Sequence, residues 1–186
     1  TVDRHYRPGL KSFGPNYNLN LPQEMDRIDE IVVVLETSED ATALEEKVTS
    51  ARELAAVSKS KVLVEADGLI GGLMRVMGKD GEGFRVAREE AVRAIWAIAV
   101  YGCDEVGKGL FKYDGLVDCL LGRMREGGGW ERKYAACAIK SIAYGDMEVK
   151  KGLFKHEGLI DGLIEIAGQT EYAVGAIAYI ACGDME

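Results

Sequence analysis

Residues 102–108 come closest to a ligand-binding motif in this sequence. Their two glycines and Lys108 fit G-x-x-x-x-G-K, a loop whose backbone N–H groups and lysine cradle nucleotide phosphates. The next residue is Gly109, whereas a phosphate loop needs a magnesium-binding serine or threonine at that position. A helical pattern precedes the motif, although such a loop follows a strand. We therefore expect no nucleotide-binding site.

Other reactive side chains stand alone in the sequence. Thr1 could act as an amino-terminal nucleophile only beside an activating base, and the chain shows none of the strand patterns of the β-rich enzymes that use one. His156 falls at a predicted helix end, where a cation is favoured by the helix dipole. Neighbouring acids such as Glu89 and Glu90 point about 100° apart on a helix, so they do not converge as an acid–base pair. We expect no catalytic residue, no cofactor and no metal site.

The composition is that of one globular domain with an acidic surface. The chain has 186 residues and a formal net charge of −8, enough to bury a core without disulfides. The excess of carboxylates argues against nucleic-acid binding, which needs a basic surface. The longest apolar run, residues 94–101, is far shorter than the ~20 residues that span a bilayer. We expect neither nucleic-acid binding nor membrane insertion.

The cysteines are scattered and form no C-x-x-C pair, which favours free thiols in a reducing intracellular compartment. The sequence begins with Thr1 rather than methionine. We expect the cytoplasm, or an organelle (chloroplast or mitochondrion) if a leader was removed before Thr1. The four cysteines are Cys103, Cys119, Cys137 and Cys182.

Two patterns repeat along the chain in step with each other. The sequence KGLFK at residues 108–112 returns at 151–155, and each copy leads into an acidic residue, a glycine, a leucine and a β-branched residue. The pattern AIxxIA occurs at 94–99, 138–143 and 176–181, and a diverged glycine segment, VEADGLI, lies at 64–70. This indicates a repeated unit of 43 to 47 residues.

The apolar spacing inside each unit is helical. Residues 91–99 and 135–143 carry apolar side chains at i, i+3, i+4, i+7 and i+8, with many alanines that let helices approach closely. Gly68, Gly115 and Gly158 separate two shorter stripes, where a left-handed glycine ends a helix. Each unit is therefore a short helix, a glycine corner, a second helix, a variable loop (78–83 or 127–129) and a longer third helix. Residues 31–35 look β-like, but 24–36 also fit a helical face, so we expect an all-α chain.

This unit resembles the armadillo repeat over about residues 42–186, with VEADGLI at the corner and AxxAIxxIA on the third helix; HEAT repeats lack both features. The first of the third helices is expected at residues 45–59. The resemblance implies a right-handed α-solenoid at residues 24–186, with three to four repeats and the last incomplete. We expect further repeats or a cap beyond Glu186 in the natural protein. Residues 1–23 hold all three prolines and are predicted to form an extended N-terminal arm.

Stacked third helices line a concave groove in the armadillo family, and the resemblance implies that this groove binds other proteins. Its peptide-binding members hold the ligand backbone with asparagines, but those positions here are Glu53, Ala97, Ser141 and Tyr179. The tryptophan ladder of the nuclear-import adaptors is also absent, so we do not expect recognition of basic nuclear-localisation peptides. Trp96 is interpreted either as a packed residue or as a groove contact. The predicted partner-binding residues of the groove are Arg88, Arg93, Trp96, Lys133, Lys140, Ser141, Tyr172 and Tyr179.

The arm adds a second predicted contact region. Its aromatic residues Tyr6, Phe13 and Tyr17, together with Arg7, are typical of interface anchors. The arm either folds back over the first repeat or lies on a neighbouring subunit.

The sequence thus predicts a non-catalytic interaction module or adaptor that binds a partner protein through the groove and the arm. The alternative is a permanent structural or assembly subunit of a larger complex, an organellar one if a leader precedes Thr1.

Overall fold

The structure, a computed structural model, describes residues 21–57, 60–66, 68–102 and 104–183. Every regular element in these residues is helical, which confirms the all-α prediction. In chain order they are α1 (Leu21–Thr37), α2 (Ala41–Val57), α3 (Ser60–Glu65), α4 (Leu69–Met77), the 3-10 turn η1 (Glu82–Phe84), α5 (Arg85–Tyr101), α6 (Asp104–Phe111), α7 (Leu116–Glu126), α8 (Gly129–Ile142), α9 (Met147–Lys155), α10 (Leu159–Ile166) and α11 (Glu171–Ala181).

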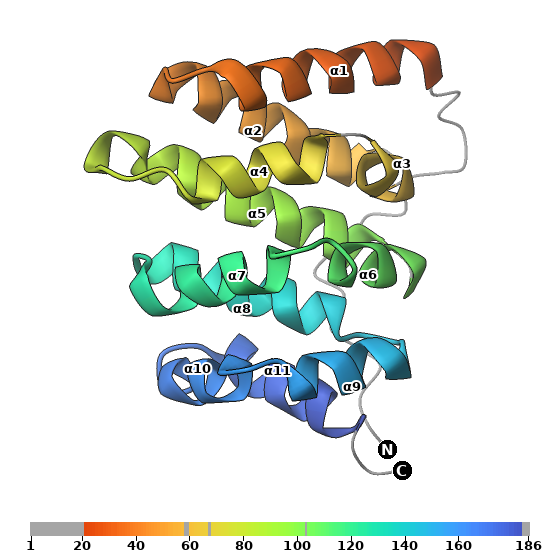
Figure 1. Cartoon of the computed structure of the whole chain (residues 1–186), viewed down its shortest axis with the longest axis vertical. Coiled ribbons are helices and arrows are strands. Elements are labelled where there is room, and N and C mark those ends of the chain that lie inside the picture. Colours follow the sequence, from red (N-terminus) through yellow and green to blue (C-terminus); the bar gives the residue numbers. More distant parts are fainter. Residues whose placement is uncertain (1–20, 58–59, 67, 103, 184–186) are drawn as a thin grey trace.

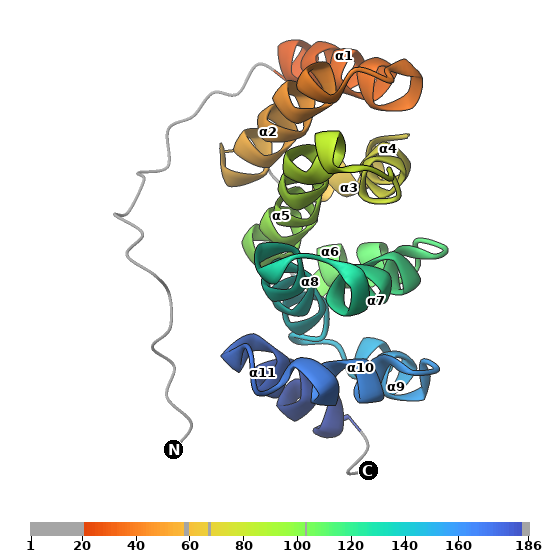
Figure 2. The ribbon, with the colours of Figure 1, turned by 90° about the vertical axis from the view of Figure 1, so that its left-hand side faces the viewer.

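The helices stack as repeated units along one axis (Figure 1). Three units of three helices, α3–α5, α6–α8 and α9–α11, follow a first pair made by α1 and α2. The third helices α2, α5, α8 and α11 each contact the next and form one layer. Figure 2 shows this layer on one side of the stack and the shorter helices on the other. The molecule is therefore an α-solenoid of three-helix units, as the repeated patterns predict.

The glycine corners adopt the predicted backbone conformation. Gly68, Gly115 and Gly158 have φ angles of 80°, 75° and 71°, in the left-handed region. Each lies immediately before the second helix of its unit. A glycine has no Cβ atom to clash in this conformation. It therefore lets the chain reverse between two short helices within a few residues.

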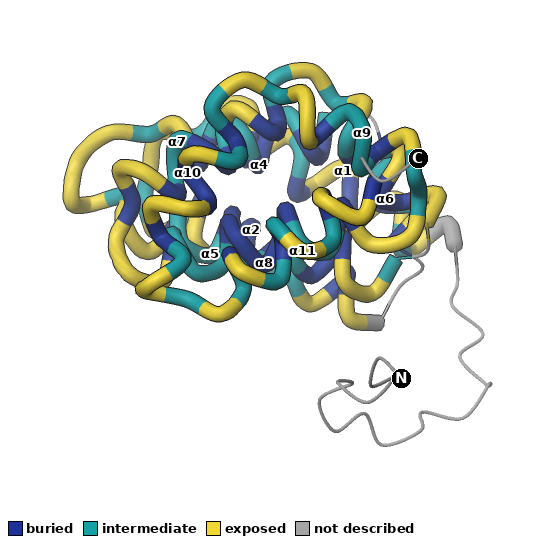
Figure 3. Tube along the Cα trace, turned by 90° about the horizontal axis from the view of Figure 1, so that it is seen from below, coloured by how far each residue is buried: buried dark blue, intermediate teal, exposed yellow. Residues whose placement is uncertain are grey.

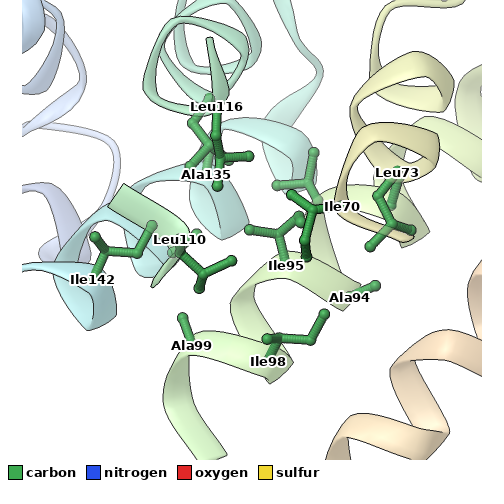
Figure 4. Close-up of a cluster of buried hydrophobic side chains, with 14 of the residues drawn as sticks. Ile70, Leu73, Ala94, Ile95, Ile98, Ala99, Leu110, Leu116, Ala135 and Ile142 are labelled. Atoms are coloured by element: carbon green, nitrogen blue, oxygen red, sulfur yellow. The ribbon is translucent and has the colours of Figure 1, made fainter. Parts of the chain in front are cut away.

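The core lies between the two layers and runs without interruption along the whole stack. Figure 3 shows the buried parts of the chain facing inward between the layers. In the close-up of Figure 4, Ile70 of α4 and Ile95 of α5 meet near Leu116 of α7, while Leu110 of α6 lies near Ile142 of α8. All five are fully buried. Each unit thus completes its core with side chains of its neighbours, so stability depends on stacking.

Two helices begin earlier than the sequence patterns predict. Helix α1 begins at Leu21, so the last three residues assigned to the arm (21–23) are helical. Pro22 is compatible with this start because the first turn of a helix does not use its N–H groups. Helix α2 begins at Ala41, four residues before the expected start at residue 45, and Asp40 Oδ1 accepts a hydrogen bond of 2.7 Å from the Ala43 N–H. The β-like run at 31–35 lies within α1, as predicted.

None of the helices in the described residues is both long and apolar enough to traverse a bilayer.

Candidate protein-binding face

The third helices present a continuous surface on the side of the stack away from the shorter helices (Figure 2). We call it the third-helix face: the outward side chains of α2, α5, α8 and α11. Alanines on the inner side, such as Ala94 on α5 and Ala138 on α8, are fully buried. Small side chains there allow close packing of neighbouring helices. The larger outward side chains of successive units are therefore within contact distance of each other.

Aromatic rings bridge α5 and α8. The Trp96 ring on α5 lies 5.4 Å from the Tyr134 ring on α8, measured between centroids. The Trp130 ring also stacks with Tyr134, at 5.9 Å between centroids and with 20° between the ring planes. The guanidinium carbon of Arg93 lies 5.1 Å from the centroid of Tyr134. Ring pairs in these geometries add roughly 0.5–1.5 kcal/mol beyond the burial of their area, so this cluster is pre-organised.

Two lysines continue the cluster from α8 to α11. Lys133 Nζ lies 5.0 Å from the Trp130 centroid and 5.5 Å from the Tyr172 centroid. Lys140 Nζ lies 5.6 Å from Tyr172 and 5.8 Å from Tyr179, the two aromatic rings of α11. Ammonium groups at this distance from a ring face are attracted to it, by about 0.5–1 kcal/mol at exposed sites. The rings therefore hold both lysines in defined positions.

We call this set the lysine–aromatic ladder. Trp130 is 55% exposed and Tyr144 62% exposed; Tyr144 meets Tyr179 edge to face at 5.5 Å. The described residues record no ion pair for either lysine of the ladder. The ladder consists of Arg93, Trp96, Trp130, Lys133, Tyr134, Lys140, Tyr144, Tyr172 and Tyr179.

The charges on α5 are balanced within the face. The carboxylate of Glu90 forms ion pairs with Arg52 of α2, at 2.8 Å, and with Arg93 of its own helix. Burial raises the pKa of the neighbouring Glu89 carboxyl above its ordinary value, although Arg93 acts in the opposite direction. Most of the formal charge on this helix is thus neutralised by internal contacts.

Helix α2 carries an acidic stripe. We use this term for Glu45, Glu46 and Glu53, which are exposed. Together with Thr42, Thr49 and Ser50 they line a shallow, open depression along the helix. The lining residues are polar and the depression is open to solvent, so it has no enclosed space for a small molecule.

Arg88 is placed differently from the other predicted groove residues. Its guanidinium donates hydrogen bonds to the carbonyl oxygens of Lys79 and Gly81, at 3.0 and 2.8 Å, and pairs with Glu131 of α8 at 3.3 Å. The side chain of Glu131 is 3% exposed and also lies 3.8 Å from Arg123. Arg88 therefore joins the loop after α4 to helix α8 of the next repeat, and its N–H donors bind groups of this chain.

The thiols of Cys119 and Cys137 are not activated. Cys137 lies on α8 between the two ladder lysines in sequence and is buried, which raises the pKa of its thiol from 9.0 to about 12 despite the nearby Lys133 and Lys140. Burial also raises the pKa of the Cys119 thiol. A thiolate is the reactive form of cysteine, so neither thiol is activated. No group of three or more metal-ligating side chains occurs in the part of the chain that the structure describes.

The structure brings most of the predicted groove residues together. Arg93, Trp96, Lys133, Lys140, Tyr172 and Tyr179 all belong to the ladder, and Ser141 is half-buried beside it on α8. Trp96 is half-buried, which fits both interpretations that the sequence leaves open. The predicted arm contacts Tyr6, Arg7, Phe13 and Tyr17 lie outside the described residues.

Three ladder residues were missed by the sequence reasoning: Trp130, Tyr134 and Tyr144. Their spacing contains the signal that could have found them. Residues 130, 133, 134, 137, 140 and 141 recur at three or four positions, which places them on one face of α8, and Tyr144 follows two residues after the end of that helix. This stripe lies beside the apolar stripe of α8 and holds every large aromatic side chain of that helix.

The fold is similar to that of a solved structure, a designed armadillo repeat protein. The two superimpose with a TM-score of 0.72 at 25% sequence identity. The match covers 83% of this chain and 64% of the designed protein, so this chain spans a little under two thirds of that protein's length. No family model matches the sequence, and no curated protein matches it either. With its three-helix units, left-handed glycine corners and stacked third helices, the chain has the armadillo-repeat fold.

Proposed function

We propose that this protein is a non-catalytic interaction module that binds a partner protein through its third-helix face, with the N-terminal arm (Tyr6, Arg7, Phe13 and Tyr17) as a second contact. The lysine–aromatic ladder is the observation that supports this function most directly. Tryptophan, tyrosine and arginine are the residues most enriched in the energetic centres of protein interfaces. In the ladder these side chains are already ordered, so this protein loses little side-chain entropy when a partner binds.

The test is capture of the native complex from its source with the full chain and with the double variant Trp130→Ala, Tyr144→Ala. Both side chains are more than half exposed, so their removal leaves the core intact. We expect a specific partner that the wild-type chain retains and the variant releases. Val33→Ala, a substitution at an exposed position of α1, serves as the matched control. A partner that the two variants retain equally well contradicts the use of this face.

We propose as the alternative the role of a permanent subunit, with the partner bound at the last described repeat. Three apolar side chains of the last described repeat are exposed, although their counterparts one repeat earlier are buried or half-buried. A Cβ atom on Gly152 or Gly162 would collide with two of these counterparts, Phe111 and Leu121. The pairs, exposed residue first, are Ile164 (58%) with Leu121 (6%), Val174 (53%) with Ala136 (0%), and Phe154 (40%) with half-buried Phe111.

Apolar side chains at the end of a stack of repeats are covered either by a further repeat or by a partner protein. The subunit role predicts that the partner is bound at this end of the stack. The double variant Ile164→Lys, Val174→Lys then loses the partner, while Trp130→Ala, Tyr144→Ala retains it. Analytical ultracentrifugation of the captured complex separates this outcome from the first proposal. A complex unchanged by the lysine substitutions contradicts the subunit role.

A further inference from the structure

The third-helix face changes its charge along the stack. Its α2 end carries the acidic stripe, its middle is neutral, and its α8–α11 end carries the two ladder lysines among aromatic rings.

At the α2 end, the carboxylates of Glu45 and Glu53 have no ion-pair partner within the described residues. Glu46 lies 3.9 Å from Lys47, but Lys47 is already engaged by Glu30 at 2.6 Å. All three glutamates of the stripe are exposed. This end of the face therefore attracts a cationic side chain.

In the middle, the single carboxylate of Glu90 is shared by Arg52 and Arg93. Arg93 also lies over the Tyr134 ring, and the Trp96 ring lies 5.4 Å from the same ring, between centroids. These contacts pair the charges of Glu90, Arg52 and Arg93 with one another and place aromatic rings beside them. A ligand crossing α5 meets an aromatic platform suited to an apolar or aromatic side chain.

At the other end, the ammonium groups of Lys133 and Lys140 are held over rings and not against carboxylates of the described residues. An ammonium has three donors, and a ring face uses the charge without satisfying them all. A Cβ atom on Gly175 of α11 would lie 3.0 Å from Lys140 Cε, so the glycine lets the lysine stem lie against the helix. This end presents two fixed cations that accept carboxylates from outside the chain.

The separation of the two ends sets the length of the ligand. Neighbouring packed helices lie about 8–10 Å apart, so α2 and α8, with α5 between them, are separated by roughly 16–20 Å. An extended chain rises about 3.3 Å per residue. Five or six residues therefore span the distance from the acidic stripe to the first ladder lysines.

We propose that the third-helix face binds an extended segment of a partner protein whose charge is segregated. A basic side chain lies at the acidic stripe, acidic side chains lie at Lys133 and Lys140 about five or six residues away, and an apolar or aromatic side chain rests on Trp96 and Tyr134 between them. This inference rests on the proposed function and specifies its ligand. Single-stranded nucleic acid is disfavoured, because the same face would set its phosphates against the acidic stripe.

The test uses fluorescence anisotropy with the full chain and labelled peptides of one composition. The first two peptides carry two arginines, a spacer of about five residues with one leucine and one tyrosine, and two glutamates, in either chain direction. The matched control has the same residues with the four charges interspersed. We expect one of the first two to bind at least about tenfold more tightly than the control, because complementary charge patterns decide between ligands of equal composition.

Charge exchange identifies the contacts. The double variant Lys133→Glu, Lys140→Glu is expected to lose the preference for the segregated peptide over the interspersed one. A segregated peptide with lysines in place of its glutamates is expected to bind to that variant again. Lys112→Glu, Lys155→Glu, with both exposed lysines outside the third-helix face, makes the same change in net charge and is expected to keep the preference. Because reversal could disturb packing, Lys133→Gln, Lys140→Gln is measured in parallel and is expected to weaken binding about threefold to tenfold.

Several results overturn the proposal. They are equal binding of the segregated and interspersed peptides, no binding of any peptide, and binding of the original segregated peptide to Lys133→Glu, Lys140→Glu as tightly as to the wild type. Tighter binding of polyuridine RNA than of the segregated peptides also overturns it. The proposed function fails separately, when the native partner is indifferent to Trp130→Ala, Tyr144→Ala. A native partner that is lost with those alanines but indifferent to charge reversal refutes the segregated ligand and leaves the proposed function standing.

Discussion

A Cβ atom on Gly162 would lie 2.5 Å from Cδ1 of Leu121, so this glycine of α10 lies directly against a buried leucine of the preceding repeat. The contact joins two units at a point where only a hydrogen atom fits. Gly72 and Leu35 make the corresponding contact two repeats earlier, where a Cβ atom added to Gly72 would lie 2.8 Å from the Cβ of Leu35. Stacking of the units therefore depends on close approach at a few glycines as well as on apolar area.

Gly162→Val is expected to destabilise the protein by about 1–3 kcal/mol, because added methyl groups force a packed core apart. Gly122→Ala is the control, since that glycine lies in helix α7 with no atom within 4 Å of its added Cβ. Alanine there is expected to raise stability by up to about 1 kcal/mol. Urea unfolding measures both, and equal stability of the two variants contradicts the contact.

Gly115→Ala is expected to cost about 1–2 kcal/mol, because the residue has a left-handed φ of 75°. The nearest atom to an added Cβ, Met74 Cε, lies 3.5 Å away, so the loss reports backbone conformation and not a clash. Gly83→Ala, at an open position without positive φ, is expected to leave the thermal midpoint unchanged. A wild-type melt for Gly115→Ala would remove the left-handed corner from the description.

Glu131→Ala is expected to destabilise the protein by about 3 kcal/mol, because it leaves Arg88 and Arg123 partly buried beside an empty site. The double variant Arg88→Met, Glu131→Leu is expected to lose less than the sum of its single variants. Chemical denaturation of the wild type, Arg88→Met, Glu131→Leu and the double variant measures this coupling. Simple additivity would show that the two side chains act independently.

The pH dependence of stability is expected to involve Asp146 at the start of α9. Its side chain pairs with Lys108 at 2.7 Å and accepts the Val149 N–H at 3.0 Å, and these contacts lower the pKa of the carboxyl below 3.8, Lys108 acting most strongly. The stabilisation is complete above pH 3.8 and is lost as the pH falls through the lowered pKa. The thermal midpoint of Asp146→Ala should therefore lie below that of the wild type at neutral pH, and the gap should narrow in acid. A constant gap would contradict the ionic part of this contact.

Cys137 is expected to resist thiol reagents near neutral pH, where exposed Cys182 reacts. Burial raises the pKa of Cys137 to about 12, which favours the neutral thiol in the folded state. Its contribution to stability is complete below pH 9.0, the ordinary value, and is lost as the pH rises toward 12. Mass spectrometry after timed labelling checks the first statement. Labelling of both residues at one rate would contradict it.

The fold could be predicted from the sequence because the same pattern of glycines and apolar residues recurs in each repeat. Gly68, Gly115 and Gly158 recur with apolar stripes on both sides, and local spacing determines both the corner and the buried face. The start of α1 at Leu21 was missed because Pro22 was interpreted as a mark of extended chain, although a proline is also compatible with a first helical turn.

The site was predicted only in part, because its contacts cross between repeats. The ring of Tyr134 meets Trp96 from the preceding unit, a register that no single helix pattern contains. Arg88 was interpreted as a groove residue, but its partners are two carbonyl groups in a loop and Glu131 of the next unit. Both outcomes depend on how the units stack, which local spacing does not determine.

Trp96 and Trp130 are the two tryptophans of the chain, and both lie against Tyr134 at the junction of α5 and α8. Their emission therefore reports on a single seam of the stack. Flexing of the stack between α5 and α8 alters the separation of the Trp96 indole from the Tyr134 ring, because Trp130 and Tyr134 share α8. Tryptophan fluorescence therefore reports on this junction without an added label.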